Sequence, residues 1–314
     1  MGPSRNYSID SLKFYCALAV VLIHSQFLFK DVVLPLLRVA VPIFFMISGY
    51  FIYGEKAEQR IKKAITKISL ILAWSTLLFA FLKEIFLIVH HDVYVPNAQD
   101  LVNFFVFNEN PFGWHLWYIG AYLYVLIIVW VIARYDKWIL LFKSVPILLI
   151  ALLFLSYISV ERIYYRNFLF MGLPFFAIGA YVRKKNRLVN RKILYVLISL
   201  LSMSSLAEIY VTNQNLEIYL STIFLSILIF AFFIGREQPN SSLSSIGGQY
   251  SLYIYIFHGV FVLYFFPTLN GHCGNLWNRI YNSFSPIFIF CATSLFIVLY
   301  KKGFSSFKFI SNAK

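Results

Sequence analysis

The chain alternates between long apolar runs and short polar segments from one end to the other. A helix needs roughly 17 to 25 apolar residues to cross a bilayer, and ten runs are about that long. They cover residues 11–30, 35–54, 67–90, 114–133, 144–160, 168–183, 193–211, 217–235, 250–267 and 283–300. The pattern predicts an all-α, polytopic integral membrane protein with about ten transmembrane helices.

One connection, from His91 to Gly113, is much longer than the others. Its middle, AQDLVNFFVF at 98–107, carries aromatic residues at helical spacing and alternates poorly as a strand. This spacing predicts a short helix that lies on the outer membrane surface. The helix either covers an outward-facing cavity or is a plain connector.

The composition confirms the class. Hydrophobic residues make up 60% of the chain, charged residues only 13%, and the mean hydropathy is +0.74. A soluble protein has about a quarter of its residues charged, so a soluble class is excluded and the lipid bilayer is the expected surrounding. The net charge of +14 does not indicate nucleic acid binding, because the basic residues form short clusters between apolar runs.

The distribution of Lys and Arg predicts the orientation. Cytoplasmic segments of membrane proteins are enriched in these residues. If the N-terminus is cytoplasmic, all but six of the 27 Lys and Arg residues lie inside or near the inner surface. The six are Lys30, Arg38, Lys83, Arg162, Arg166 and Arg279. Both termini are therefore expected in the cytoplasm.

We find no internal repeat and no second soluble domain. The chain is expected to form a single transmembrane domain over residues 1–314, in which 1–4 resemble a cloning remnant and 301–314 form a cytoplasmic tail. The three cysteines, Cys16, Cys273 and Cys291, have no close spacing, so neither a disulfide framework nor a metal site is indicated.

The first apolar run contains three ionisable residues, Asp10, Lys13 and His24. Lys13 and His24 are eleven positions apart. In a helix this spacing differs from three full turns by only about 20°, and it corresponds to a rise of roughly 16 Å. Asp10 is about 40° round from His24 by the same arithmetic. Ionisable groups inside a membrane usually face a cavity or one another. His24 is either a general base that takes up a proton or a structural histidine bonded across a helix interface.

A basic row precedes the third run. Arg60, Lys63 and Lys67 are three and four residues apart, so they line one side of a helix. Together with Lys13 they would form a cationic collar suited to a polyphosphate. Each of them can alternatively be explained as charge that only sets the membrane orientation.

Polar residues also occur in the second, fourth and ninth runs. Ser48 can hydrogen-bond between helices, and Pro42 is expected to break its helix. His115 and Trp117 combine a polar donor with an aromatic plane, which suits a sugar ring, although tryptophan is also typical of a membrane interface.

In the ninth run, Ser251 and His258 are seven residues apart and share a face with Tyr255. This stripe either lines a cavity shared with the first helix or makes a structural polar contact.

Four stretches together resemble the membrane acyltransferase-3 family. They are the Asp10, Lys13 and His24 pattern, VPIFFMISGY at 41–50, HLWYI at 115–119 and SLYIYIFH at 251–258. The chain is most similar to the short, single-domain members that O-acetylate a glycan such as enterobacterial common antigen. Lys13 stands where Arg is commoner, and the paired arginines frequent before the third span are replaced by Arg60, Lys63 and Lys67.

The resemblance implies transfer of an acyl group, usually acetyl, from cytoplasmic acetyl-CoA to a hydroxyl of a glycan or lipid-linked saccharide in the bacterial inner membrane. It implies no metal, and a homo-oligomer is possible. The implied catalytic residues are His24, Asp10 and His258. The implied CoA-binding residues are Lys13, Arg60, Lys63, Lys67 and Ser48. The implied acceptor-binding residues are His115, Trp117, Ser251 and Tyr255.

Two alternatives stay open at this point. His24 is either a general base or a transient acyl carrier. The protein as a whole could instead be a transporter or flippase of an anionic or glycolipid substrate, with His24 and His258 in a proton pathway.

Overall fold

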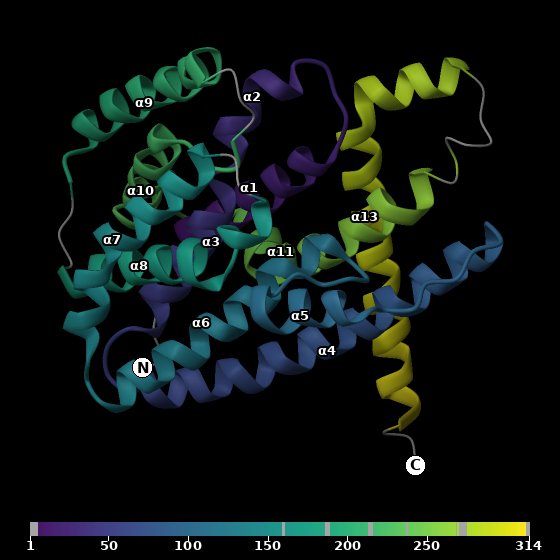
Figure 1. Ribbon diagram of the computed structural model, residues 1–314, viewed down its shortest axis with the longest axis horizontal. Coiled ribbons are helices and arrows are strands. Elements are labelled where there is room, and N and C mark those ends of the chain that lie inside the picture. The colour runs from purple at the N-terminus through teal and green to yellow at the C-terminus, as the bar shows by residue number, and fades with distance from the viewer. Residues whose placement is uncertain are drawn as a thin grey trace.

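The structure is a computed structural model, and it describes residues 6–311 apart from 159–160, 186–188, 213–215, 237, 268 and 270–274. The expected cloning remnant at 1–4 and Cys273 lie outside the described residues. Most of the described chain is helical, and its long helices pack around a common apolar core (Figure 1).

The helices follow the apolar runs closely. They are α1 (Tyr7–His24), α2 (Lys30–Leu37), α3 (Ala40–Ile52), α4 (Ala57–Val89), α5 (Ala98–Phe107), α6 (Trp117–Arg134), α7 (Trp138–Tyr157), α8 (Leu173–Lys185), α9 (Arg191–Thr212), α10 (Leu220–Ile234), α11 (Ser242–Val260) and α13 (Asn275–Ser311). Among the described residues, eight helical stretches are long and apolar enough to cross a membrane, and α10 is a shorter apolar helix. The predicted polytopic, all-α class is confirmed.

Two of the expected spans depart from a regular α-helix. The run at 35–54 is divided between α2 and α3, and Pro42 lies in the first turn of α3, where its missing N–H group costs no helical hydrogen bond. The expected break therefore falls just before Pro42, at Arg38 and Val39. The run at 168–183 begins as a π-helical turn, Phe168–Gly172, and continues as α8.

Helix α1 lies at the centre of the bundle. It packs along the length of α11 and also contacts α2, α3, α10 and α13. The Asn6 side chain caps its N-terminus by accepting a hydrogen bond from the Ile9 N–H at 3.0 Å. Gly247 permits the close approach of α11, because a Cβ atom there would overlap the Asp10 carbonyl oxygen. This contact sets the position of the ionisable face of α1.

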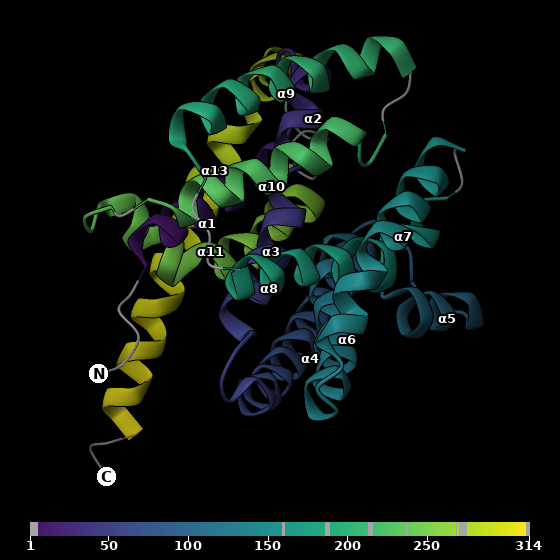
Figure 2. The same cartoon turned by 90° about the vertical axis from the view of Figure 1, so that its left-hand side faces the viewer.

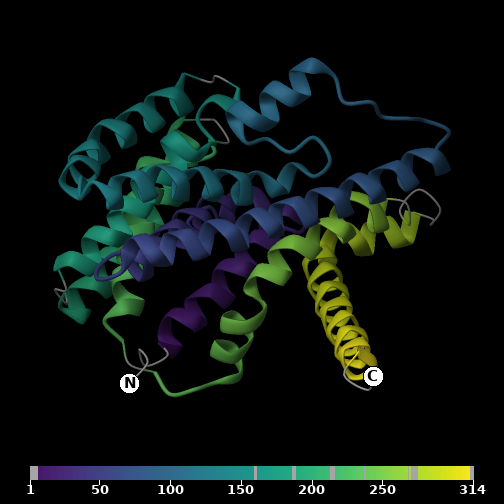
Figure 3. The ribbon, with the colours of Figure 1, turned by 90° about the horizontal axis from the view of Figure 1, so that it is seen from below.

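The other helices pair around this centre. Helix α3 packs on α8, α4 on α6, and α9 on α10. Figure 3 shows α4 crossing nearly the whole width of the molecule. Helix α13 continues through the expected tail to Ser311, and its C-terminal end projects beyond the other helices (Figures 1 and 2).

The predicted short helix in the long connection is confirmed as α5, Ala98–Phe107. A capping box fixes its start: Asn97 accepts from the Asp100 N–H, and Asp100 accepts from the Asn97 N–H. No residue of α5 is buried, and it lies at the edge of the molecule (Figure 2). Its placement on a membrane surface and the cytoplasmic location of the termini stay predictions.

We expect Gly247→Ala to lower the free energy of unfolding by about 1–3 kcal/mol, because the new methyl group must push α11 away from α1. Denaturant unfolding of the detergent-solubilised protein measures the change. Gly248→Ala is the control, since this neighbouring glycine is exposed. Equal stability of the two variants would contradict the close contact.

Candidate active site

Three histidines from distant parts of the chain lie together. His24 ends α1, His115 lies in the 3₁₀ turn Trp114–Leu116, and His258 lies near the end of α11. The rings of His24 and His258 are stacked with centroids 5.4 Å apart, and those of His115 and His258 are 5.2 Å apart. Trp114 packs its ring edge-on against His24 at 4.4 Å. We call these four residues the histidine cluster.

Two of the histidines have one ring nitrogen fixed by a backbone carbonyl. Nδ1 of His258 lies 3.2 Å from the Ile254 oxygen, and Nε2 of His115 lies 3.2 Å from the Ile256 oxygen. Because a carbonyl only accepts, these nitrogens carry the hydrogens. The opposite nitrogens are buried and have no hydrogen-bond partner among the described residues. No group of three metal-ligating side chains in the described part of the chain is arranged to hold a metal ion.

The cluster is supported by α11. The Tyr255 hydroxyl donates a hydrogen bond to the His115 carbonyl oxygen. Gly259 leaves room for the His115 ring, which a Cβ atom at that position would overlap. His115 is 1% exposed and lines neither the cavity beside His24 nor the cavity beside Tyr255, which are described next. Its position therefore does not support the predicted direct contact with an acceptor.

His24 also lines a cavity of about 460 Å³, which we call the outer cavity because the predicted orientation places its basic residues outside. The wall is rich in charged side chains, unlike the apolar bundle around it. It consists of Ile23, His24, Lys30, Asp31, Leu34, Arg38, Trp114, Arg162, Arg166 and Glu217.

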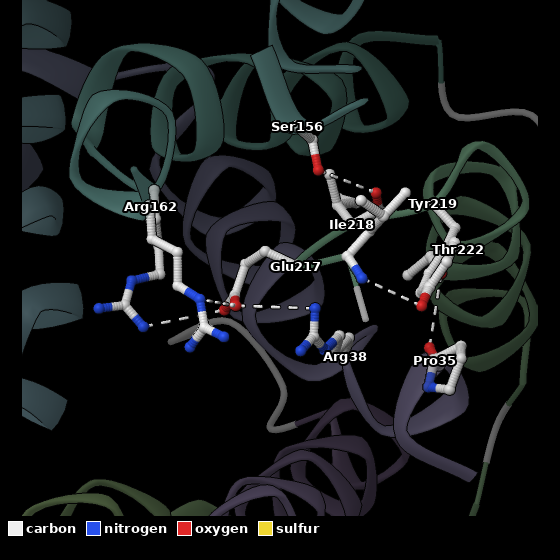
Figure 4. Close-up of polar contacts among 10 residues, drawn as sticks. Pro35, Arg38, Ser156, Arg162, Glu217, Ile218, Tyr219 and Thr222 are labelled. Carbon is white, nitrogen blue, oxygen red and sulfur yellow. Dashed lines mark hydrogen bonds and ion pairs between the residues drawn. The ribbon is translucent and has the colours of Figure 1, made fainter. Parts of the chain in front are cut away.

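Glu217 is the centre of the charge cluster in this wall. Figure 4 shows its carboxylate between Arg162 on one side and Arg38 on the other. The ion pairs measure 3.6 Å to Arg38, 3.9 Å to Arg162 and 3.9 Å to Arg166. Glu217 lies in the connection between α9 and α10, where burial disfavours its charge, but the three guanidinium groups together hold the pKa of the carboxyl below its usual range.

A second, smaller cavity of about 190 Å³ is lined by Tyr255 and by residues near the collar end of α1, and we call it the inner cavity. Four residues predicted for the site line it: Lys13, Ser48, Ser251 and Tyr255. The structure thus brings together polar residues from α1, α3 and α11. The Ser48 hydroxyl donates to the Phe44 carbonyl oxygen at 3.0 Å within its own helix.

The predicted cationic collar is partly present. A wide cavity of about 850 Å³ at the turn between α3 and α4 is lined by Arg60 and Lys63, but Lys67 is not among its lining residues. Arg60 donates to the carbonyl oxygens of Phe51, Tyr53 and Glu55, so it closes the end of α3. The other cations of this wall, Lys56 and Arg183, were not singled out from the sequence.

Lys13 lies close to the collar. Its Nζ atom is 5.6 Å from the ring centre of Phe51, whose carbonyl accepts from Arg60. The same nitrogen forms an ion pair with Asp10 at 3.0 Å. Asp10 is thus engaged with Lys13, about 21 Å along α1 from His24. The structure does not bring Asp10 and His24 together, although they share a side of the helix.

Sequence reasoning did not select Arg38, Arg162, Arg166 or Glu217. A signal was present, because the three arginines are among the few basic residues left on the outer side by the expected orientation. Trp117 is linked to this group, since the Arg166 guanidinium lies 5.2 Å from the centre of its ring. Trp117 itself is 7% exposed and does not line the outer cavity.

Comparison with known proteins gives one family and several distant relatives. Residues 6–301 match the model of the acyltransferase domain of the acyltransferase 3 type. A serine/alanine racemase of Enterococcus gallinarum is 28% identical over 297 residues, which cover 81% of this chain and 40% of the racemase. An amino-acid racemase of Enterococcus faecalis is 32% identical over 145 residues, 41% of this chain and 20% of that protein.

The chain thus spans less than half the length of these curated relatives. No solved structure matches it. The narrower resemblance to the O-acetyltransferase of enterobacterial common antigen stays a prediction.

We expect Glu217→Gln to destabilise the protein by about 3 kcal/mol at pH 7, because it leaves the largely buried Arg38 and Arg166 without their shared counter-charge. Denaturant unfolding in detergent measures the loss. Glu58→Gln, which removes the exposed pair with Lys62, is the control and should change little.

The stability difference between wild type and Glu217→Gln should depend on pH in a defined direction. The folded pKa of Glu217 is depressed, so its contribution is fully present above the ordinary glutamate pKa of about 4.3 and is lost as the pH falls through the folded value. The stability difference between wild type and Glu217→Gln should therefore shrink below about pH 4. A difference that grows on acidification would contradict the ion-pair assignment.

Proposed function

The chain belongs to the acyltransferase 3 family of membrane proteins, and on that basis we propose that it transfers an acyl group, acetyl in the simplest case, from acetyl-CoA to a hydroxyl of a cell-surface glycan or lipid-linked saccharide. The observation that carries this proposal is the position of His24. The histidine lines the outer cavity and is stacked on His258, which is in contact with the ring of Tyr255 at 6.0 Å between centroids. Tyr255 in turn lines the inner cavity. A donor and an acceptor that enter from opposite sides would meet at this cluster.

The donor is assigned to the side of the collar. Lys56, Lys63 and Arg183 offer several cations to the phosphates of CoA, while Arg60 holds the end of α3. From there, an extended pantetheine arm would pass Lys13 and enter the inner cavity beside Ser48 and Ser251. The small volume of this cavity suits a linear chain and a short acyl group better than a ring.

The acceptor is assigned to the outer cavity. Trp114 provides an aromatic surface beside His24, which supports the binding of a sugar ring there. The sequence predicted direct acceptor contact for His115 and Trp117, but their burial supports positioning roles for them instead. His115 holds its place against His258, and Trp117 lies under Arg166.

In the direct route, His24 takes the proton of the acceptor hydroxyl. The acceptor oxygen then bonds to the carbonyl carbon of the thioester, the carbon–sulfur bond breaks, and the CoA thiolate receives the proton from His24. In the two-step route, a nitrogen of His24 attacks the same carbon, the carbon–sulfur bond breaks, and CoA leaves as the thiol with the proton of the other ring nitrogen. The acceptor hydroxyl then attacks the acyl-imidazole, the carbon–nitrogen bond breaks, and the hydroxyl proton returns to the His24 ring.

The names of the relatives do not alter this proposal. Serine/alanine racemase and amino-acid racemase describe proteins of which this chain covers 40% and 20% of the length. The family match, in contrast, extends over residues 6–301.

We expect His24→Ala to lower acceptor-dependent release of CoA by at least about 100-fold, because it removes either a general base or an acyl carrier. Release of free thiol from acetyl-CoA is measured with purified protein and a bacterial glycolipid extract. His90→Ala is the control, since His90 is exposed at the end of α4. Unchanged release by His24→Ala would end the proposal, and movement of labelled lipid without CoA release would favour transport.

Single-turnover kinetics separate the two routes. Without acceptor, an acyl carrier releases up to one CoA per protein in a rapid burst, whereas a general base releases none. The burst is measured after rapid mixing of protein with acetyl-CoA. His24→Ala must remove it, because a burst that persists in this variant would place the acyl group elsewhere.

We expect Lys63→Gln combined with Arg183→Gln to raise the KM for acetyl-CoA about tenfold or more, with little effect on the KM for the acceptor, because both cations face the collar cavity. Steady-state kinetics with each substrate varied in turn give both constants. Lys62→Gln is the matched control, since Lys62 is paired with Glu58. A rise confined to the acceptor KM would reverse the donor assignment.

A further inference from the structure

We infer that the outer cavity binds an acceptor that carries an anionic group, a carboxylate or a phosphate, held between Arg38 and Arg166. The inference rests on the proposed acyl transfer and names the class of acceptor for that site. Three observations support it: the two arginines are largely buried with few hydrogen-bond partners, the charges of the cavity wall do not cancel, and His24 lines the same cavity.

Arg38 is the first observation. Its side chain is only 9% exposed, and it lies at the interruption between α2 and α3. Its Nη1 atom is buried without a hydrogen-bond partner among the described residues, since the nearest Glu217 oxygen is 3.6 Å away. A buried guanidinium donor without an acceptor is costly and rare. Arg38 lines the outer cavity, so an anionic group bound there would supply this guanidinium with a closer counter-charge.

Arg166 lines the same cavity, and its carboxylate partners are also beyond hydrogen-bond distance. Its side chain is 12% exposed, and its contacts to Glu109 and Glu217 measure 3.7 and 3.9 Å, which is longer than a hydrogen bond. The ring of Trp117 lies 5.2 Å from the guanidinium and helps to fix its position. Both arginines are thus held in place while their donors are weakly used.

The charges of the wall do not cancel. Lys30, Arg38, Arg162 and Arg166 face only two carboxylates, those of Asp31 and Glu217. Adding Glu109, which pairs with Arg166 from outside the wall, still leaves one positive charge without a counterpart. A site that served only to hold Glu217 would need fewer cations, and an excess positive charge beside the largely buried Arg38 and Arg166 favours binding of an anion.

The position of His24 gives this anion site a role in the reaction. His24 and both arginines line the same cavity, with Trp114 beside the histidine. An acceptor anchored by its anionic group at the arginines would present a hydroxyl toward His24. Planar guanidinium forks bind carboxylate or phosphate oxygens in pairs, which would fix the orientation of that hydroxyl.

The first test identifies the charge of the product. The protein is incubated with radiolabelled acetyl-CoA and a total glycolipid extract, and the labelled lipid is separated on an anion exchanger. Label in the retained fraction is the expected result, and label in the neutral fraction overturns the inference while leaving acyl transfer intact. No label in any lipid, in contrast, means that the proposed function itself has failed.

The retained fraction also distinguishes the two anionic groups. Amidation of the extract with methylamine and a carbodiimide neutralises carboxylates and leaves phosphates charged. If amidation before the reaction abolishes labelling, the recognised group is a carboxylate. If labelling and retention persist, it is a phosphate.

The second test assigns the recognition to the arginines. Arg38→Lys keeps the charge and loses the fork, so we expect the KM for the anionic lipid fraction to rise about tenfold while the KM for acetyl-CoA stays within twofold. Arg134→Lys, an exposed arginine at the end of α6, is the control. A change in kcat alone, or equal KM values in the two variants, would reduce Arg38 to a structural partner of Glu217 and overturn the assignment.

Discussion

The packing of α1 along α11 is the contact on which the rest of the candidate site depends. Gly247 lets the two helices approach until backbone meets backbone, and the approach places His24 at one end of α1 against His258 of α11. Near the other end, Lys13 and Ser251 face a common cavity. One helix pair thus positions both the polar entrance and the histidines, which explains why an apolar bundle tolerates ionisable residues there.

The candidate site lies between two charged cavities whose basic residues are arranged differently. On the collar side, Lys56, Lys63 and Arg183 surround a wide cavity, as expected for a flexible polyphosphate. At the outer cavity, Arg38 and Arg166 are largely buried and form ion pairs with Glu217. Figure 4 shows Arg38 beside this carboxylate. A wide cavity with several cations suits a donor that must enter and leave, whereas fixed guanidinium groups suit selection among acceptors.

Some features of the site could be predicted from spacing alone. Lys13 and His24 recur at nearly whole helical turns, and Ser251, Tyr255 and His258 do so on a second helix, so each stripe could be read as one face. The structure adds that the two stripes meet, and that Tyr255 connects them to His115. It also pairs Asp10 with Lys13, which agrees with the rise of about 21 Å that helical spacing already places between Asp10 and His24.

By itself, the sequence determined the membrane class, the helical runs and the short helix α5, because hydropathy, periodicity and capping are properties of neighbouring residues. The tertiary structure alone decided which polar residues meet. Glu217 is far from Arg38 and Arg162 in the sequence, but in the structure its carboxylate forms ion pairs with both. No pattern of neighbouring residues predicts such a contact. The interruption at Arg38 shows the same limit: Pro42 indicated a break, but the arginine became part of the site only through packing against the segment before α10.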